Sequence, residues 1–454
     1  MNPLHIVILA AGKGTRMYSK LPKVLHRIGG RSMLERVIQT ARSLNPDAVH
    51  VVIGHGKEQV LQQLAHVDAD WVEQTEQLGT GHAVKTALPR LPEHGRTLVL
   101  YGDVPLTDRD TLQQLLDAAG AEVGLLTDVL DNPTGYGRII REDSKVVAIV
   151  EEKDADAAQK AVREVNTGIF VLPNKHLAGW LNELQSNNAQ GEYYLTDVIG
   201  LAKRDGVAVH PVAVRASHLA AGVNNKVQLA ELERIFQAEQ AQALLQAGLT
   251  LRDPARFDLR GSLKHGQDVV IDVNCVLSGD VELADGVEIG ANCVLNNVKI
   301  GAGSVIEPFS HLDGCEVGAD AHIGPYARLR PQAVLADGVH IGNFVEVKNS
   351  RIGQGSKANH LTYIGDAEVG ERSNIGAGTI TCNYDGVNKH RTVIGNDVRV
   401  GSGTMIVAPV SIEDRATTGA GSVITKTCPA NKLSIGRARQ TTIEHWVRPE
   451  KPQK

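Results

Sequence analysis

The sequence predicts an α/β protein in which a mostly parallel sheet, covered by helices, is followed by a linker helix and then by a parallel β-helix. Three features of the 454 residues support this fold class. Strand-like and helix-like runs alternate in the first half, a helical stretch without Gly or Pro follows, and an aliphatic residue then recurs with a period of six. We therefore expect domains at 1–225 and 248–454, joined by a linker helix at 226–247.

The first domain shows the pattern of a parallel sheet with helices on both faces. Buried strands are predicted at 5–9, 48–53 and 97–101, and helices at 33–41 and 59–66. In folds of this kind, ligands bind beyond the carboxyl ends of the strands. Because Gly-rich turns follow the first and third of these strands, we expect a binding site there.

The linker helix is predicted from residues 226–247, where Leu229, Leu232 and Phe236 recur at helical spacing. The β-helix is predicted because each hexapeptide of such a fold forms one flat face with its aliphatic residue directed inward. The polar segment 381–391 interrupts the repeats, and we expect it to leave the coil as a loop, where functional residues concentrate. The open faces of a solenoid also favour association with further copies. Aliphatic residues of three registers define the repeats: Ile271, Leu277, Leu283 and Ile289; Val317, Ile323, Leu329, Leu335, Ile341 and Val347; Ile394, Val400, Ile406, Ile412 and Ile424.

Composition excludes several other classes of protein. The net charge of -5 gives no whole-chain basic field for nucleic acid. The apolar run near the N-terminus has the length of a strand and precedes its basic residues, which is the wrong order for a signal peptide. Five cysteines without a CxxC pair favour free thiols in a reducing compartment. We expect a cytoplasmic protein with neither nucleic acid nor membrane as a partner.

Two motifs at predicted strand ends suit a phosphate-bearing ligand. The segment LAAGKGTRM, residues 9–17, offers backbone N–H groups, and Arg16 and Lys23 add positive charge. It is neither the dinucleotide fingerprint nor a P-loop, and a tight strand–helix turn with solvated basic side chains is an alternative. In YGDVPL, residues 101–106, Asp103 suits a Mg²⁺ ion held between phosphates, or serves only as a turn carboxylate before Pro105.

The motifs together resemble a known family. They are similar to the nucleotidyltransferases that join a nucleoside triphosphate to a sugar 1-phosphate. With the hexapeptide half attached, nearly the whole chain resembles the bacterial family of bifunctional N-acetylglucosamine-1-phosphate uridyltransferase/glucosamine-1-phosphate N-acetyltransferases. The resemblance implies a Rossmann-like nucleotidyltransferase domain, a left-handed β-helix and a homotrimer. Its further motifs are EQLGTGHA (76–83), NPTGYGRI (132–139), VEEKDA (150–155), NTGIF (166–170), GEYYLTD (191–197) and GVNN (222–225).

The implied chemistry has two steps. Glucosamine 1-phosphate is acetylated by acetyl-CoA, and UMP then passes from UTP to N-acetylglucosamine 1-phosphate with release of pyrophosphate. The second step requires Mg²⁺ but no protein nucleophile, because the attacking phosphate is already ionised; Lys23 and Arg16 would reduce the repulsion between the anions. Asp103 and Asn225 would ligate the metal, although an Asn before a helix also serves as a cap. The residues implied for UTP and the sugar are Leu9, Ala10, Gly12, Lys23, Gln74, Gly79, Thr80, Tyr101, Gly137, Glu151, Asn166, Tyr194 and Asn225.

The repeat half carries candidates for acetyl transfer. Arg330, Lys348 and Lys389 should project from the aliphatic coil, where they suit a sugar phosphate or form only a solvated face. A His with a pKa near neutral can take the proton of an amine, and Glu346 could orient or charge-pair the ring of His360. The chain has 17 His, however, and a lone His is more often structural. The resemblance implies that His360 is the general base. It implies that glucosamine 1-phosphate is bound by Arg330, Lys348, Tyr363 and Asn374, and acetyl-CoA by Ala377, Asn383, Tyr384, Ser402, Ala420 and Arg437.

Three points stay open at this level. Arg439 lies close to Arg437, and either can meet the coenzyme phosphates. The β-helix can be only an oligomerisation or regulatory module beside a working nucleotidyltransferase, or the whole chain can be a non-catalytic binding protein. The first of these functional alternatives is opposed by the joint presence of His360, Lys348, Arg330 and Tyr363. The second is opposed by the presence of Lys23, Asp103 and Asn225.

Overall fold

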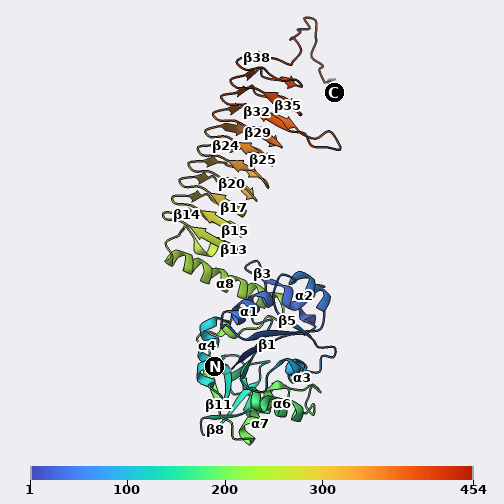
Figure 1. The fold of residues 1–454 in the computed structure, drawn as a ribbon, viewed down its shortest axis with the longest axis vertical. Coiled ribbons are helices and arrows are strands. Elements are labelled where there is room, and N and C mark those ends of the chain that lie inside the picture. Colours follow the sequence, from blue (N-terminus) through green and yellow to red (C-terminus); the bar gives the residue numbers. More distant parts are fainter. Residues whose placement is uncertain (1–2, 452–454) are drawn as a thin grey trace. The chain divides into compact units, whose positions relative to one another are not determined.

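The computed structural model describes residues 3–451, and the chain divides into two compact units, 1–237 and 238–454 (Figure 1). The division falls within helix α8 (Lys226–Gln246), the helix of the 226–247 stretch. Within the described residues, no helix is both long and apolar enough to cross a membrane. The five cysteines are unpaired, as expected, and burial raises the pKa of Cys275 to about 11.

The first unit is built on a nine-stranded sheet with the order β11-β7-β10-β6-β1-β4-β5, to which the β8–β9 hairpin is joined through β10. Strand β1 (Leu4–Ala10) runs parallel to both β4 (Ala48–Ile53) and β6 (Arg96–Tyr101), which confirms the prediction of a mostly parallel sheet. Strand β10 (Glu164–Pro173) is antiparallel to its neighbours. The other strands are β5 (Asp70–Glu73), β7 (Val123–Val129), β8 (Arg138–Glu142), β9 (Lys145–Val150) and β11 (Val209–Ala213), with a separate pair β2 (Arg27–Ile28) and β3 (Arg31–Ser32).

Helices cover both faces of this sheet because each buries one apolar side. Helices α1, α2 and α4 pack into one core with β1, and α3, α6 and α7 pack into a second core on the other face. Ser32 caps α1 by accepting the Glu35 N–H at 3.2 Å. The helix expected at 59–66 begins earlier, at Lys57, directly after Gly56 with its left-handed φ of 72°. The helices are α1 (Met33–Arg42), α2 (Lys57–Gln63), α3 (Thr80–Ala87), α4 (Arg109–Ala119), α5 (Ala157–Lys160), α6 (Asn174–Glu183) and α7 (Val198–Arg204).

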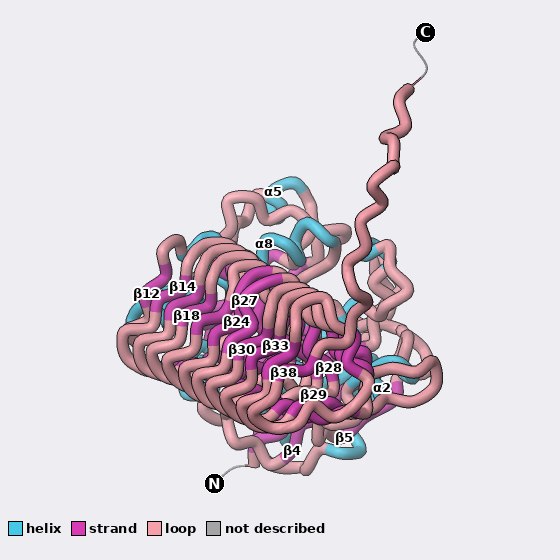
Figure 2. The backbone as a smooth tube through the Cα atoms, turned by 90° about the horizontal axis from the view of Figure 1, so that it is seen from above, coloured by secondary structure: helices cyan, strands magenta, loops and turns pink. Residues whose placement is uncertain are grey.

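The second unit is a parallel β-helix, as the period of six predicts. Successive coils stack so that each strand pairs in parallel with its counterpart one coil on, and Figure 2 shows one such row from β12 to β38. The inward residues of one coil, Ile323, Leu329 and Leu335, are at most 2% exposed. The row drawn in Figure 2 consists of β12 (Thr250–Leu251), β14 (Val270–Ile271), β16 (Glu288–Ile289), β18 (Val305–Ile306), β21 (His322–Ile323), β24 (His340–Asn343), β27 (Lys357–His360), β30 (Asn374–Ile375), β33 (Arg399–Val400), β36 (Thr417–Thr418) and β38 (Leu433–Ser434).

Two further rows complete the coils. The long strands β13 (Phe257–His265), β15 (Cys275–Leu283) and β17 (Val294–Ile300) lead into both, since β17 pairs with β19 and with β20. One row has β19 (His311–Asp313), β22 (Arg328–Leu329), β25 (Glu346–Lys348), β28 (Tyr363–Gly365), β31 (Ile380–Cys382), β34 (Met405–Val407) and β37 (Val423–Ile424). The other has β20 (Glu316–Val317), β23 (Val334–Leu335), β26 (Arg351–Ile352), β29 (Ala367–Val369), β32 (Thr392–Ile394) and β35 (Val410–Ile412).

Candidate active sites

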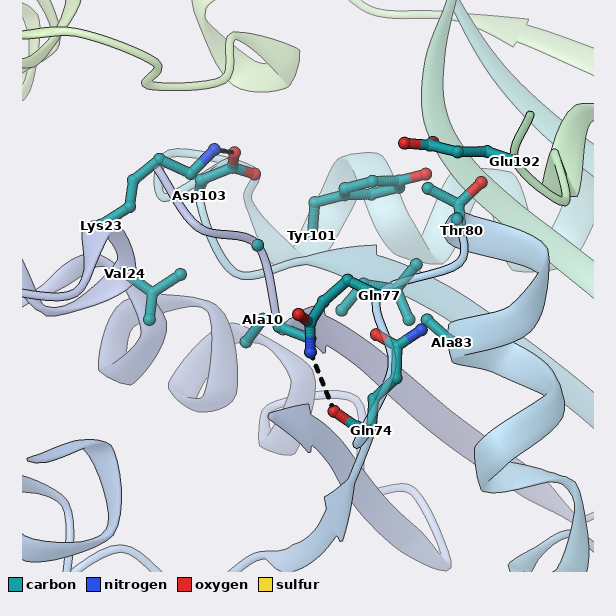
Figure 3. Close-up of a pocket in the computed structure, with 14 residues that line it drawn as sticks. Ala10, Lys23, Val24, Gln74, Gln77, Thr80, Ala83, Tyr101, Asp103 and Glu192 are labelled. Atoms are coloured by element: carbon teal, nitrogen blue, oxygen red, sulfur yellow. Dashed lines mark hydrogen bonds and ion pairs between the residues drawn. The ribbon is translucent and has the colours of Figure 1, made fainter. Parts of the chain in front are cut away.

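A cavity of about 270 Å³ opens at the carboxyl ends of β1 and β6 in the first unit (Figure 3). The two strands are parallel, so the turns that follow them meet at one edge of the sheet. Nine of the residues expected from the sequence line this cavity: Leu9, Ala10, Gly12, Lys23, Gln74, Gly79, Thr80, Tyr101 and Asp103. Five lining residues were not expected individually, although all except Val24 lie inside a motif singled out above: Ala11, Val24, Gln77, Ala83 and Glu192.

One side of the cavity carries an ion pair between the Lys23 ammonium and the Asp103 carboxylate, drawn in Figure 3. Their side chains are only 14% and 17% exposed. The Gly14 turn lies close against Lys23, because a Cβ on Gly14 would stand 2.6 Å from the Lys23 Cβ. The left-handed φ of 61° at Gly14 also favours glycine. The Gly-rich turn therefore sets the position of the cation.

Asn224 faces this ion pair. The Asn224 Oδ1 accepts hydrogen bonds from Arg16 Nη2 at 3.0 Å and from Lys23 Nζ at 3.3 Å. The Asn225 Oδ1 instead accepts the Gln228 N–H at 2.9 Å and so caps α8. Capping α8 uses one lone pair of the Asn225 oxygen and is compatible with the expected contact to Mg²⁺, which stays a prediction. The Asn224 oxygen, which was not expected, points to the charged groups.

The residues expected to read the base lie around the start of α3. Gln74 is 3% exposed, and its side chain forms a hydrogen bond of 2.9 Å with His82 Nδ1. Gly79, with a φ of 112°, lies against the Tyr193 backbone, where a Cβ would approach the carbonyl oxygen to 2.6 Å. Thr80 Oγ1 accepts the Leu195 N–H at 3.0 Å. These contacts fix polar groups at the inner wall of the cavity.

The residues expected to hold the sugar form a second cluster next to Tyr101. Burial raises the pKa of Glu151, and Thr196 Oγ1 donates a hydrogen bond to its carboxylate at 3.1 Å. Burial also raises the pKa of Tyr101, and the nearby charge of Glu151 adds to this shift. A Cβ on Gly137 would lie 3.1 Å from Glu151 Oε1, so glycine leaves the carboxylate accessible there.

The two remaining members of this cluster are held by local hydrogen bonds. The Asn166 N–H donates to the Gly137 carbonyl at 2.9 Å, which fixes the two residues side by side. The Tyr194 hydroxyl accepts a hydrogen bond from Gln190 Nε2 at 2.9 Å. Unlike Tyr101, the residues Gly137, Glu151, Asn166 and Tyr194 are not among those that line the cavity.

In the second unit, the expected cations lie on neighbouring coils. Lys348 of β25 pairs in register with Gly365 of β28, and Arg330 follows β22 one coil earlier. Lys389 lies against Lys348, and its proximity, more than burial or Arg330, holds the pKa of Lys348 below its ordinary value. Three like charges held together in this way form a ready site for an anion such as a phosphate.

Tyr363 projects over Gly365 in the same strand. A Cβ on Gly365 would stand only 2.2 Å from the Tyr363 hydroxyl oxygen and 2.5 Å from its Cζ. Any other residue at 365 would therefore displace the ring. The sequence gives no direct sign of this contact, since glycines are frequent throughout the repeats.

His360 lies exposed at the end of β27, and Asn343 of β24 pairs with it in register. The His360 Nδ1 and Asn343 Oδ1 are 2.7 Å apart. The expected partner Glu346 is engaged elsewhere, with Arg330 at 2.7 Å and Arg328 at 3.5 Å. The neighbour of His360 is therefore Asn343 and not Glu346, because successive coils bring residues 17 positions apart into register here.

Three residues expected at the coenzyme lie one above another. The Gly403 N–H donates to the Ala377 carbonyl and the Gly421 N–H to that of Ser402, so that Ala377, Ser402 and Ala420 occupy equivalent places on successive coils. Arg437 is exposed and lies 4.0 Å from the position of a Cβ on Gly421, whereas for Arg439 the structure gives no such contact. Asn374 begins β30 one coil beyond Lys357.

The loop expected at 381–391 is shorter than expected. Thr381 is 1% exposed inside β31, and its hydroxyl donates to the Gly365 carbonyl at 3.0 Å, so the chain leaves the coil only after Cys382. Asn383 is buried, and its amide donates to Asp366. Tyr384 is 61% exposed and pairs with Lys389 across the loop. The loop thereby carries Lys389 back to Lys348.

The chain is similar to known proteins over nearly its whole length. The family model of the MobA-like NTP transferase domain matches residues 6–243, and that of the GMPPB C-terminal domain matches residues 311–416. A relative from Neisseria meningitidis serogroup B is 72% identical over 451 residues, which cover 99% of both chains. Relatives from Chromobacterium violaceum and a Janthinobacterium species are 64% and 58% identical, each over 99% of this chain and 99% and 100% of their own. All three are named bifunctional protein GlmU, and this chain belongs to that family.

Proposed function

We propose that the chain is a bifunctional transferase of UDP-N-acetylglucosamine synthesis. Its second unit acetylates glucosamine 1-phosphate with acetyl-CoA, and its first unit then transfers UMP from UTP to N-acetylglucosamine 1-phosphate. The observation that best supports the proposal is the presence of two separate anion-binding clusters, Lys23 with Arg16 in one unit and Lys348 with Arg330 and Lys389 in the other. Full-length similarity to proteins named bifunctional protein GlmU agrees with it.

In uridylyl transfer, a phosphate oxygen of the sugar attacks the α-phosphorus of UTP. The new P–O bond forms as the bond to the β-phosphate breaks, and pyrophosphate leaves with the electron pair. Lys23 and Arg16 stabilise the negative charge that gathers on the departing group. Gln74, Gly79 and Thr80 hold the uracil, while Glu151 and Asn166 orient the sugar.

The donor set of the first site fits Mg²⁺. A carboxylate oxygen of Asp103 and the amide oxygen of Asn225 are hard ligands of the kind this ion prefers, and Lys23 links Asp103 to the neighbouring Asn224. Held by these residues, the ion would screen the phosphate charges. The Asn225 oxygen also caps α8, and its second lone pair stays available to the ion.

In acetyl transfer, the amine nitrogen of glucosamine 1-phosphate attacks the thioester carbonyl of acetyl-CoA. The C–N bond forms, the C–S bond breaks, the amine proton passes to His360, and the CoA thiolate leaves. Arg330, Lys348 and Lys389 bind the phosphate, and Tyr363 and Asn374 orient the sugar. The row of Ala377, Ser402 and Ala420, with Asn383, Tyr384 and Arg437, receives the coenzyme.

A homotrimer is proposed because the family resemblance implies it, and an apolar ladder along one edge of the β-helix supports association between copies. Phe309, Tyr326, Phe344 and Leu361 occupy the same corner of successive coils and are 50%, 47%, 56% and 62% exposed. The ring centroids of Phe309 and Tyr326 lie 4.9 Å apart, and those of Tyr326 and Phe344 lie 5.4 Å apart. A continuous apolar edge of this kind suits burial against a second copy. The unpaired cysteines support a reducing compartment such as the cytoplasm.

The direct test supplies glucosamine 1-phosphate, acetyl-CoA, UTP and Mg²⁺ to the purified protein and follows free CoA and pyrophosphate separately. Release of both, with pyrophosphate dependent on prior acetylation, would establish two activities and their order. If pyrophosphate appears only when N-acetylglucosamine 1-phosphate is supplied and no CoA is released, the β-helix is an oligomerisation or regulatory module, and acetyl transfer is wrong.

A further inference from the structure

The immediate partner of His360 is an uncharged side chain. Asn343 precedes it by one coil, and the two residues pair in register between β24 and β27. The distance of 2.7 Å between His360 Nδ1 and Asn343 Oδ1 is that of a good hydrogen bond. Among residues 3–451, this is the one side-chain hydrogen bond that the structure gives to the His360 ring.

The bond selects one tautomer of the ring. An amide oxygen can only accept, so Nδ1 must carry the hydrogen, and in the neutral ring Nε2 is then left with the free lone pair. With the other tautomer, the two lone pairs would face each other. The coil thereby presents Nε2 as the one nitrogen able to take up a proton.

His340 of β24 is one titratable neighbour of His360. Burial lowers the pKa of His340, and the nearby charges of His322, Lys357 and His360 lower it further. The nearest carboxylate considered from the sequence, Glu346, is paired with Arg330 and Arg328. A carboxylate on Nδ1 would favour the protonated imidazolium, whereas an amide orients the ring without adding negative charge.

We propose that Asn343 is a positioning residue for acetyl transfer, which holds Nδ1–H of His360 so that Nε2 receives the proton of the attacking amine. The inference rests on the proposed function, in which His360 is the general base. In this role Asn343 acts through His360 and not on the sugar or the coenzyme directly. Its effect is on which nitrogen is free and on the pH range over which it stays free.

Three variants of the full chain test the assignment. Asn343→Ala removes the acceptor, Asn343→Asp keeps an acceptor but adds a charge, and Asn274→Ala is the matched control. Asn274 donates a similar hydrogen bond between coils, to Asn292 at 3.1 Å, outside the expected site. CoA release is measured against pH from about 5.5 to 9.5, and pyrophosphate release from N-acetylglucosamine 1-phosphate and UTP serves as the internal control for folding.

Asn343→Ala should lower kcat of acetyl transfer about 10- to 100-fold with little change in KM for glucosamine 1-phosphate. Asn343→Asp should retain more activity but move the acidic limb of the pH profile about one unit upward, because the carboxylate stabilises the imidazolium. ¹⁵N chemical shifts of the His360 ring should report hydrogen on Nδ1 in the parent and a mixture of tautomers in Asn343→Ala. Uridylyl transfer and Asn274→Ala should be unchanged.

An unchanged kcat in Asn343→Ala, or an acidic limb that does not move in Asn343→Asp, would overturn the positioning role. Should the alanine variant fail to fold, the aspartate variant decides alone. His360→Ala separates this inference from the proposed function. If that variant still releases CoA at the parent rate, the base assignment itself is wrong; if it is inactive while the Asn343 variants match the parent, only the inference about Asn343 fails.

Discussion

The two candidate sites are built in opposite ways. In the first unit, residues from distant stretches of the chain, such as Leu9, Gln74 and Asp103, line a cavity of about 270 Å³, and the cation Lys23 is already paired with a carboxylate. In the β-helix, the expected residues lie on an outer face, where His360 and Tyr384 are exposed and Lys348 faces another ammonium group. At the edge of the sheet, turns from distant parts of the chain surround the first site. In the β-helix, the second site is formed by residues that stack above one another on successive coils.

The two sites should be sensitive to different kinds of substitution. Enclosed sites depend on close backbone approaches, as where Gly14 lies against Lys23. The coil site depends on which residues share a position on successive turns, as Asn343 with His360 and Lys348 with Gly365. Lys348 and Lys389 repel each other there, whereas Arg330 is already paired with Glu346. Variants should therefore separate the two activities cleanly, and four experiments test this separation.

The largest effect is expected from His360→Ala. Without a group to take the amine proton, acetyl transfer should fall by about 10²- to 10⁴-fold. Uridylyl transfer from added N-acetylglucosamine 1-phosphate should continue at the parent rate, as measured by pyrophosphate release. His311→Ala, another exposed histidine of the β-helix, is the control and should alter neither activity. Loss of both activities in folded His360→Ala protein would contradict the assignment of two independent sites.

Lys23→Ala should produce the reciprocal result. Removal of a preorganised charge at the departing pyrophosphate should lower kcat of uridylyl transfer about 10²- to 10³-fold. It also leaves Asp103, whose side chain is 17% exposed, without its cation. CoA release should be unaffected. The exposed Lys20 offers a nearby control, since Lys20→Ala keeps the same change of charge outside the cavity. Equal losses in the two variants would show that Lys23 acts only through net charge.

Much of this arrangement could be predicted from the sequence, and the failures have physical causes. The period of six predicts the coil and its inward residues, because burial repeats at every face. It does not predict register exactly, since coils of 17, 18 and 25 residues all occur. The register that places Asn343, 17 positions before His360, beside its ring therefore could not be predicted.

The first unit shows a similar limit. The motifs predicted most of the residues that line the cavity, because they mark the turns after β1 and β6. They could not predict that Asn224 contacts Arg16 and Lys23, since either amide of this segment can cap a helix or face a ligand. The start of α8 at Lys226 decides that the Asn225 oxygen caps the helix. Thr381 was expected in a loop because it is polar, but a buried hydroxyl bonded to Gly365 is satisfied inside the coil.

Gly365→Ala tests the dependence of the second site on register. The added Cβ would stand 2.2 Å from the Tyr363 hydroxyl oxygen, so the ring must swing away from its place over Gly365. We expect KM for glucosamine 1-phosphate to rise about tenfold, while KM for UTP stays the same. Gly179→Ala gives a control outside the second site, because a Cβ there meets no atom within 4 Å and the residue has no left-handed φ. An unchanged KM in Gly365→Ala would remove Tyr363 from the sugar site.

The smallest effect, on pH dependence, should come from Lys389→Met. Lys389 lowers the pKa of Lys348, so Lys348 loses its charge at a lower pH than an isolated lysine does. Since phosphate binding requires that charge, affinity for glucosamine 1-phosphate should fall as pH rises through the lowered pKa. Without Lys389 the pKa of Lys348 returns upward, and the fall should move to higher pH, while affinity at neutral pH decreases about three- to tenfold for the lost cation.

KM for glucosamine 1-phosphate, measured in steps from neutral to alkaline pH, checks this prediction. Lys299→Met, which removes an exposed lysine from β17, is the control and should leave the profile in place. If the pH dependence of KM in Lys389→Met matches that of the parent, the charge of Lys348 does not contribute to phosphate binding. The cations of the coil would then be solvated surface groups without a role in phosphate binding. The two sites would differ in the exposure of their cations, and not in whether the cations bind a phosphate.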